Sequence, residues 1–450
     1  SNVAVGYNAL DANTTASNNT AVGQAALGAN TTGTDNVAVG SNALDANTTA
    51  SNNTAVGDNA LGANTTGTGN SALGADALDA NTTGDSNLAL GKSALSSNTT
   101  ASLNTAVGVA AMEANTTGAN NVAVGALALD ANTTADNNTA VGYNSLTANT
   151  TGDLNVAIGG NALQSNVAGD RAVAIGYQAL NAQNPSGNVD TYNVAIGLNS
   201  MAQTTTGIDN VAVGGLSLTS NTTASNNTAV GRSALAANTT GDYNVAVGSL
   251  ACDANTTGRY NTVVGGNGFT SNTTGTGNTS LGTSALRDNT TANYNVAMGI
   301  DAMQLNTTGA HNVAVGSYAL NANTTADNNT AVGFEALHTN TTGSENVAVG
   351  RLALTTSTTA SSNTAVGNAA LYLNTTGANN VAVGSSALDA NTTASNNTAV
   401  GYSALSANTV GNHSTALGYN AGALTTGSRN TWIGALCGDA NTGGTGSVGV

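Results

Sequence analysis

Charged and aromatic side chains are scarce in this chain of 450 residues, at 7% and 3% of the sequence, and it has a single proline, Pro185. The few basic residues form no cluster and the net charge is −16, which argues against nucleic acid or an anionic membrane surface as a partner. No run of 18 apolar residues is present, so we expect no membrane insertion by this segment. The two cysteines, Cys252 and Cys437, lie too far apart to form a metal or redox motif.

Small residues make up most of the sequence in place of charged and aromatic ones. Glycine, asparagine, threonine and alanine dominate, yet 40% of the chain is apolar, mostly alanine, valine and leucine. A disordered chain of similar polarity has fewer apolar residues. Side chains of this size can fill a thin core but not a large spherical one.

A 17-residue repeat runs through the whole sequence. Its anchor is a glycine that closes Asn-Val-Ala-Val-Gly or Asn-Thr-Ala-Val-Gly. The anchors are Gly6, Gly23, Gly40, Gly57 and every 17th residue to Gly176, then Gly197 to Gly418 in the same steps, and finally Gly434 and Gly449. We number the consensus N-[VT]-A-V-G-x-x-A-L-x-A-N-T-T-[GA]-x-x as repeat positions 1 to 17, beginning at Asn2.

Repetition at this period is the signature of a solenoid. We therefore predict an all-β fold: a parallel β-solenoid, or β-roll, that is continuous over residues 1–450, with about 26 coils and two short strands per coil. Coils stacked about 4.8 Å apart would make a rod of about 125 Å. Residues 181–193 are predicted to form an insertion loop, and residues 419–450 to form irregular coils.

The substitutions at each repeat position predict which way it faces. Positions 4 and 9 hold sizeable apolar residues, so we expect both to point into the core, together with positions 2 and 11. The tyrosines fall at positions 6, 7, 10 and 17, which we expect to face solvent. The glycine at position 5 indicates a backbone angle that only glycine reaches cheaply, or a contact without room for Cβ. The predicted structural columns are Gly6, Gly23, Gly40 and Gly57; Val5, Val22 and Val39; and Leu10, Leu27 and Leu44.

One such coil buries little, and ordering its residues costs about as much as that burial returns. The alanines at positions 3 and 8 would lie on the opposite strand faces, where a second buried surface explains their small size. We therefore predict a homo-oligomer. Hydrogen-bonded columns of the position 12 asparagines and the position 14 threonines would add to its stability.

The motif at the end of the first strand resembles the YadA-like head repeat of trimeric autotransporter adhesins. The matching segments are Asn120-Asn121-Val122-Ala123-Val124-Gly125 and Asn155-Val156-Ala157-Ile158-Gly159. Repeats in tail-fibre-like proteins of phages and environmental bacteria are also similar. The resemblance covers nearly the whole chain and implies a left-handed β-roll with three chains side by side, exposed on a cell or virion. The usual head repeat is a few residues shorter, and no neck, stalk or anchor motif is present.

No arrangement of residues predicts catalysis, a cofactor or a metal site. The histidines His311, His338 and His413 fall at surface positions without a partner for acid–base chemistry. The calcium-binding repeat of other β-rolls is absent, which leaves only sporadic calcium binding by scattered carboxylates.

Two surface chemistries remain as alternatives. Threonines at positions 13 and 14 could form an ice-binding face, although adjacent residues of a strand point to opposite sides and turn hydroxyls also cap backbone groups. Asn-Thr-Thr is also a formal glycan acceptor. The candidate surface or glycan columns are Asn13, Asn30 and Asn47 with Thr14, Thr31 and Thr48.

The sequence thus predicts a non-enzymatic extracellular fibre or adhesin-type rod on a cell or virion surface. Its partner is itself, most simply as a trimer, and a host-surface or matrix ligand is a further expectation. The alternatives are an ice-binding solenoid and a phage tail-fibre shaft.

Overall fold

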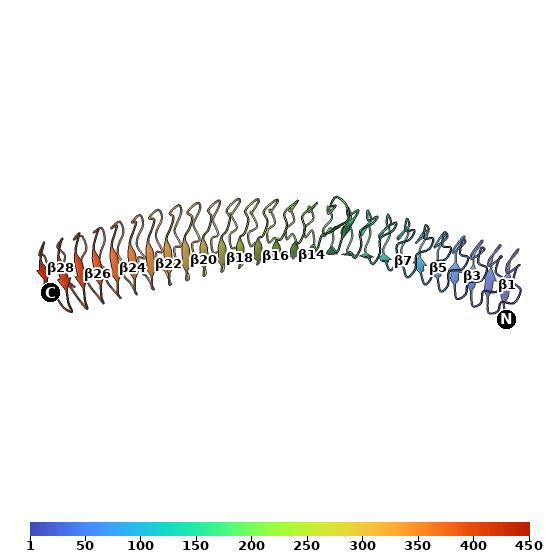
Figure 1. The fold of residues 1–450 in the computed structure, drawn as a ribbon, viewed down its shortest axis with the longest axis horizontal. Helices are drawn as coiled ribbons and strands as arrows, with labels where there is room; N and C mark the ends of the chain where they lie inside the picture. Colours follow the sequence, from blue (N-terminus) through green and yellow to red (C-terminus); the bar gives the residue numbers. More distant parts are fainter. The chain divides into compact units, whose positions relative to one another are not determined.

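The computed structural model describes residues 1–450 and contains no helix. The chain divides into two compact units, Ser1–Asn226 and Asn227–Val450. Each unit is a parallel β-solenoid in which repeat positions 2 to 4 form one short strand per coil. The strands of a unit lie side by side as rows of arrows, each followed by a returning loop (Figure 1). All-β architecture with 17-residue coils is therefore confirmed.

The strands of the first unit are β1 Val3–Val5, β2 Thr20–Val22, β3 Val37–Val39, β4 Thr54–Val56, β5 Ser71–Leu73, β6 Leu88–Leu90, β7 Thr105–Val107, β8 Val122–Val124, β9 Thr139–Val141, β10 Val156–Ile158, β11 Gly169–Asp170, β12 Val173–Ile175, β13 Val189–Asp190, β14 Val194–Ile196 and β15 Val211–Val213.

The strands of the second unit are β16 Thr228–Val230, β17 Val245–Val247, β18 Thr262–Val264, β19 Thr279–Leu281, β20 Val296–Met298, β21 Val313–Val315, β22 Thr330–Val332, β23 Val347–Val349, β24 Thr364–Val366, β25 Val381–Val383, β26 Thr398–Val400, β27 Thr415–Leu417, β28 Thr431–Ile433 and β29 Val448–Gly449.

Neighbouring coils pair in parallel and in register. In β1 and β2, for example, Ala4 lies beside Ala21, so each repeat position becomes a column. The register corrects one anchor. Gly449 pairs with Trp432 rather than with Gly434, and it therefore occupies position 3 of its coil instead of position 5.

The strand presents its middle residue to the core, which reverses the predicted facing of positions 2 and 4. The alanine at position 3 is fully buried, as at Ala21 and Ala38. The valines at position 4 lie on the outer face: Val5 is 57% exposed, and Val22 and Val39 are half-buried. The interior leaves little room for a larger residue from the strand, since the leucine at position 9 already fills it from the opposite side. The one valine at position 3, Val263, is fully buried beside a glycine at position 8, Gly268, where a Cβ atom would lie 3.2 Å from it.

The predicted second strand is wrong, because positions 6 to 11 form a ladder of turns. Its backbone groups still bond between coils, as from the Leu27 amide to the Ala43 carbonyl (2.9 Å). However, positions 7 and 9 adopt the left-handed conformation, with φ of 55° at Asn42 and 53° at Leu44. As a result, the adjacent Ala43 and Leu44 both point inward and are fully buried, which an extended strand does not allow.

Position 11, also predicted to face inward, is only partly covered, and Ala12 is exposed. The position 9 leucines are buried as expected: Leu10 is 8% exposed, and Leu27 and Leu44 are fully buried. Holding a leucine at positive φ costs roughly 1–2 kcal/mol. Burial of the leucine side chain therefore has to offset this backbone strain as well as the conformational entropy that is lost when the coil becomes ordered.

The bulkiest residue at position 3 shows how little space the core has. Trp432 occupies position 3 and is 6% exposed. Glycines stand at position 9 of its own coil and of the preceding coil, Gly438 and Gly422, where a Cβ atom would lie 2.3 and 2.4 Å from the indole. One large side chain on the strand thus requires the loss of two leucines on the other side.

The glycine at position 5 meets both conditions predicted for it. Gly23 has φ of 137°, and a Cβ atom there would lie 2.2 Å from the carbonyl oxygen of Gly40 in the next coil. Any side chain in this column would therefore collide with backbone and strain the turn.

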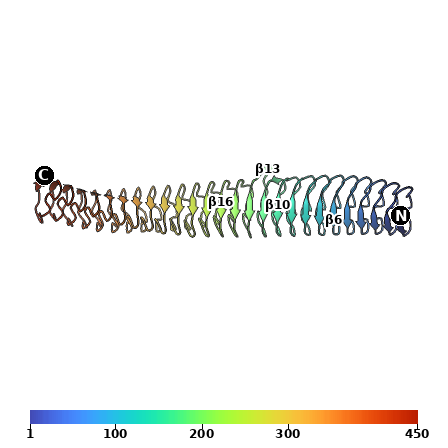
Figure 2. The same cartoon turned by 90° about the horizontal axis from the view of Figure 1, so that it is seen from below.

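The insertion adds a loop to one coil of the first unit. Its end forms β13, which pairs in parallel with β11 through Gly169–Val189 and Asp170–Asp190. In Figure 2 β13 lies apart from the main row of strands. The insertion leaves the row itself intact, because β12 still pairs in register with β14.

Candidate functional site

Most coils contain two buried asparagines, at positions 1 and 12. The predicted hydrogen-bonded column at position 12 is present, but it is buried rather than at the surface. Asn30 and Asn47 are fully buried. The Asn47 amide nitrogen donates to Asn30 Oδ1 at 3.0 Å and to the Ala50 carbonyl at 3.1 Å. Asn13, in the first coil, is partly exposed. A buried, hydrogen-bonded amide is not open to glycan transfer, so position 12 is not a glycan column.

The second buried asparagine, at position 1, was missed by the sequence analysis. The backbone amide of Asn36 donates to Asn19 Oδ1 at 2.9 Å, and the Asn36 side chain donates to the Ala50 carbonyl at 2.9 Å. The position 15 carbonyl thus accepts from both asparagines of its coil. In both units these contacts form a polar spine that runs from coil to coil.

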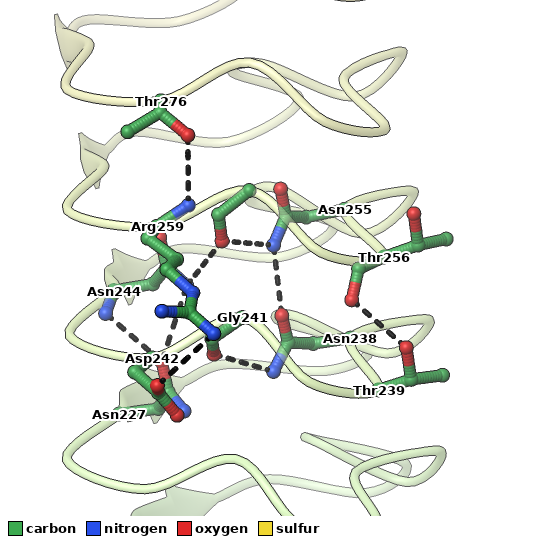
Figure 3. Close-up of polar contacts among 11 residues, drawn as sticks. Asn227, Asn238, Thr239, Gly241, Asp242, Asn244, Asn255, Thr256, Arg259 and Thr276 are labelled. Atoms are coloured by element: carbon green, nitrogen blue, oxygen red, sulfur yellow. Dashed lines mark hydrogen bonds and ion pairs between the residues drawn. The ribbon is translucent and has the colours of Figure 1, made fainter.

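The polar spine of the second unit is drawn in Figure 3. There the Asn255 amide donates to Asn238 Oδ1 at 2.8 Å, and Asn244 donates to the Gly258 carbonyl at 2.9 Å. Asn238 itself donates to the Gly241 carbonyl at 3.0 Å. The spine therefore satisfies polar groups that would be costly if buried alone.

The position 13 threonines cap backbone groups. The Thr31 hydroxyl donates to the Thr48 carbonyl of the next coil at 3.0 Å, and Thr14 makes the same contact with Thr31 at 3.1 Å. The hydrogen-bonded threonine column thus lies at position 13, one residue before the predicted position 14. At position 14, Thr32 and Thr49 are exposed.

The outer sheet face, formed by the side chains at positions 2 and 4 of the strands β1 to β29 apart from β11 and β13, is the largest unpartnered feature of each unit. Valine, threonine, leucine, isoleucine and methionine occupy it with one serine, and no residue on it is charged or aromatic. Most of these side chains are half-buried; among the more exposed are Leu73 at 49% and Leu281 at 42%. Contiguous apolar surface of this kind is typical of interaction sites.

Aromatic side chains form two stacked pairs at position 17 of the second unit, separated by the coil that has Gly277 at this position. Tyr243 and Tyr260 stack with ring centroids 5.2 Å apart, and Tyr294 stacks on His311 at 5.4 Å. Both tyrosine–histidine and tyrosine–tyrosine contacts join neighbouring coils. They stabilise the stacking of coils, as expected for aromatic pairs at a surface.

Few titratable groups of the chain depart from their ordinary chemistry, and none gathers as a metal centre would. No group of three histidine, cysteine or acidic side chains could hold a metal ion. Burial raises the pKa of the carboxyl groups of Asp45 and Asp389, both at position 10. Hydrogen bonds from backbone N–H groups lower the pKa of the same carboxyls, but by less. Burial also raises the pKa of the Cys252 thiol, which occupies position 9 in the core.

The structure has no helix that is long and apolar enough to span a membrane. No protein-family model matches the sequence, and no curated protein matches it. The outer sheet face is therefore the candidate functional site on structural grounds alone.

Proposed function

We propose that this chain is a non-enzymatic structural protein that associates with copies of itself through the outer sheet face. The product is a stiff extracellular fibre or adhesin-type rod that projects from a cell or virion surface. The observation that carries this proposal is the absence of charge from positions 2 and 4 in every coil of both units. A solvent-facing sheet normally carries charged residues that prevent association.

The area of the face supports association. Two half-exposed apolar side chains contribute about 100 Å² per coil, from the usual relation between side-chain burial and transfer energy. A stable interface needs about 800 Å² per partner. Some eight to ten coils would supply that area at this rate. Three left-handed chains around a common axis, as the adhesin resemblance implies, would enclose all of their faces.

The rest of the surface suits a spacer. Positions 6, 7, 10, 16 and 17, which are exposed or partly buried, vary from coil to coil, whereas the polar spine repeats. Ligand contacts along such a rod would be weak individually and multivalent together. A phage tail-fibre shaft would use the same construction on a virion.

Sedimentation equilibrium tests the proposal. The 43.4 kDa chain should sediment with the mass of three copies. Val22→Lys with Val141→Lys, both on the outer sheet face, should release single chains, since buried lysines lack partners. Gln24→Lys with Tyr143→Lys is the matched control: it adds the same charges at exposed position 6 of the same coils and should leave the trimer intact. A monomeric wild-type chain, or equal dissociation of both variants, would refute the proposal.

Ice binding is the second candidate, favoured by the exposed threonine at position 14 of the regular coils, as at Thr32 and Thr49. The neighbouring position 13 hydroxyls are already bonded to backbone, which leaves one threonine per coil for ice. Thermal hysteresis of the purified chain distinguishes the two functions. A hysteresis that Thr32→Lys and Thr49→Lys abolish would favour ice binding over the fibre.

A further inference from the structure

Near-identical coils create a problem of register for the assembly proposed above. If one chain slides by one coil along its partner, similar side chains face each other again at positions 2 and 4. A uniform face would therefore accept many registers of nearly equal energy. A unique assembly needs at least one place where the face departs from the repeat.

The first unit has such a place at β5 and β6. Ser71 occupies position 2, where every other coil has valine, threonine or leucine. The next coil has Leu88 at the same position, and leucines Leu73 and Leu90 replace valine at position 4. A short side chain thus stands among three long ones.

This substitution pattern leaves a hollow in the outer sheet face. The hollow has a volume of about 240 Å³, comparable with that of a few side chains, and its lining residues are Thr54, Val56, Ser71, Ala72, Leu73, Leu88 and Leu90. Three leucines project beside the hollow: Leu73 is 49% exposed, Leu88 40% and Leu90 38%. An apolar hollow and projecting leucines therefore lie within three neighbouring coils, those of β4, β5 and β6.

We infer that this hollow is a register key, filled by a leucine side chain from a second copy of the chain. The inference rests on the proposed self-association. In a closed symmetric assembly around an axis parallel to the stack of coils, equivalent coils lie at the same height. The hollow of one chain then faces the leucines of β5 and β6 in its neighbour.

A slipped register loses this match. After a shift by one or two coils toward the N-terminus, the hollow faces coils that carry Thr54, Val56 or Val37, whose side chains are shorter than leucine. The hollow stays partly empty, and the leucines press against a flat row of β-branched residues. Both faults oppose slippage, because apolar voids and overpacking each destabilise an interface.

The test compares a levelled variant with a matched control in the full-length chain. The levelled variant restores consensus residues with Ser71→Thr, Leu73→Val, Leu88→Val and Leu90→Val. The face stays apolar and uncharged, so association itself should persist. The control, Ile158→Val with Ile175→Val and Ile196→Val, trims the same face in coils that have no hollow.

Register is measured by distances between nitroxide labels on different chains. A single label at Gln24→Cys, in a background with Cys252→Leu and Cys437→Ala, reports the offset between neighbours by pulsed electron resonance. The parent and the control should give one narrow distance distribution. The levelled variant should have the same mass in solution but a broadened distribution, with added distances from offsets of about 4.8 Å per coil.

Each result decides a separate question. A levelled variant that keeps the narrow distribution of the parent would refute the key while leaving the fibre intact. Equal broadening in the control would also refute it, because the hollow would then have no special part. A monomeric parent chain would instead refute the proposed function, and the key with it.

Discussion

Ser357→Asn should stabilise the second unit, because it repairs an existing break in the polar spine. Ser357 occupies position 12, where its hydroxyl and Asn340 Oδ1 are both buried without a hydrogen-bond partner. On the other side of the break, the Asn374 amide donates to the Gly377 carbonyl, and no bond to Ser357 is formed. The break thus leaves two buried polar atoms without a partner, and the Asn374 amide lacks the bond to the preceding coil that other position 12 asparagines make.

An asparagine at this position can make the contacts of its neighbours. Its amide nitrogen would donate to Asn340 Oδ1 and to the carbonyl of Ala360, and its oxygen would accept from Asn374. Each buried hydrogen bond contributes about 1 kcal/mol net, and part of this is lost to side-chain ordering. The expected gain is therefore about 2 kcal/mol in the local opening free energy.

Native-state hydrogen exchange measures this gain where it arises, since a solenoid opens coil by coil rather than all at once. Amides of residues 340–374 should exchange about 30-fold more slowly in Ser357→Asn than in the parent. Ser357→Ala is the control, because it removes the unpaired hydroxyl without adding a donor. Unchanged exchange in Ser357→Asn, or equal slowing in both variants, would show that the spine does not act as described.

Three further outcomes follow from the same structure. Leu44→Ala should cost about 3 kcal/mol in unfolding free energy and Val39→Ala clearly less, because only Leu44 is fully buried; chemical denaturation measures both. Trp432→Ala should speed amide exchange in the last coils, and Gly438→Leu should reverse part of that effect by refilling the space, whereas Gly438→Leu alone should destabilise. Burial raises the pKa of Asp389, so the folded chain binds this proton more tightly than the unfolded chain does. The stability that the protonated group contributes is therefore full below the pKa of the unfolded chain, and it is lost as pH rises through the pKa of the folded chain. Asp389→Asn should therefore raise the unfolding midpoint near pH 7 but leave it unchanged at about pH 3.

The repeat alone was sufficient to predict the stacked coils, the inward leucines and the crowded glycine column. It did not settle the facing of the strand, because Val-Ala-Val is apolar on both faces. The size rule, by which the larger residue is placed inside, fails here since the interior is only one leucine deep. Ala21 fits beside Leu27, and the one valine in this column, Val263, stands beside a glycine, Gly268, so the regular coil has Ala21 inside and Val22 outside.

The second segment was misread for a different reason. Its left-handed residues at position 7 are often asparagine, serine or aspartate, which tolerate positive φ, and this was a usable signal. Leucine at position 9 gives no such signal, as nothing in its chemistry favours φ of 53° at Leu44. Only the burial of two adjacent residues, Ala43 and Leu44, rules out a strand.

The hydrogen-bonded asparagines at position 12 were predicted, and those at position 1 could have been identified in the same way, by their constancy. Positions 16 and 17 hold serine, aspartate, tyrosine or arginine in different coils, and their contacts with neighbouring coils change with the residue present, as at Ser51 and Asp136. Positions 1 and 12 keep asparagine in almost every coil, although asparagine is common at surfaces too. A polar residue that does not vary where its polar neighbours do has fixed partners, and here those partners are the next coil and the position 15 carbonyl, as at Asn47 and Ala50.

This separation of roles explains how a chain with so little core can carry varied surface chemistry. Stability comes from contacts that each coil makes only with its neighbours, through alanine, leucine and the polar spine. Residues at the variable outer positions can change without altering the interior, and where aromatic residues fall at position 17 they stack in pairs, as Tyr243 does on Tyr260. The outer sheet face is an exception among the outer surfaces, because the restriction to uncharged residues holds in every coil. Its lack of charge across both units is the basis of the proposed self-association, and the hollow at Ser71 is where we infer that the register of that association is fixed.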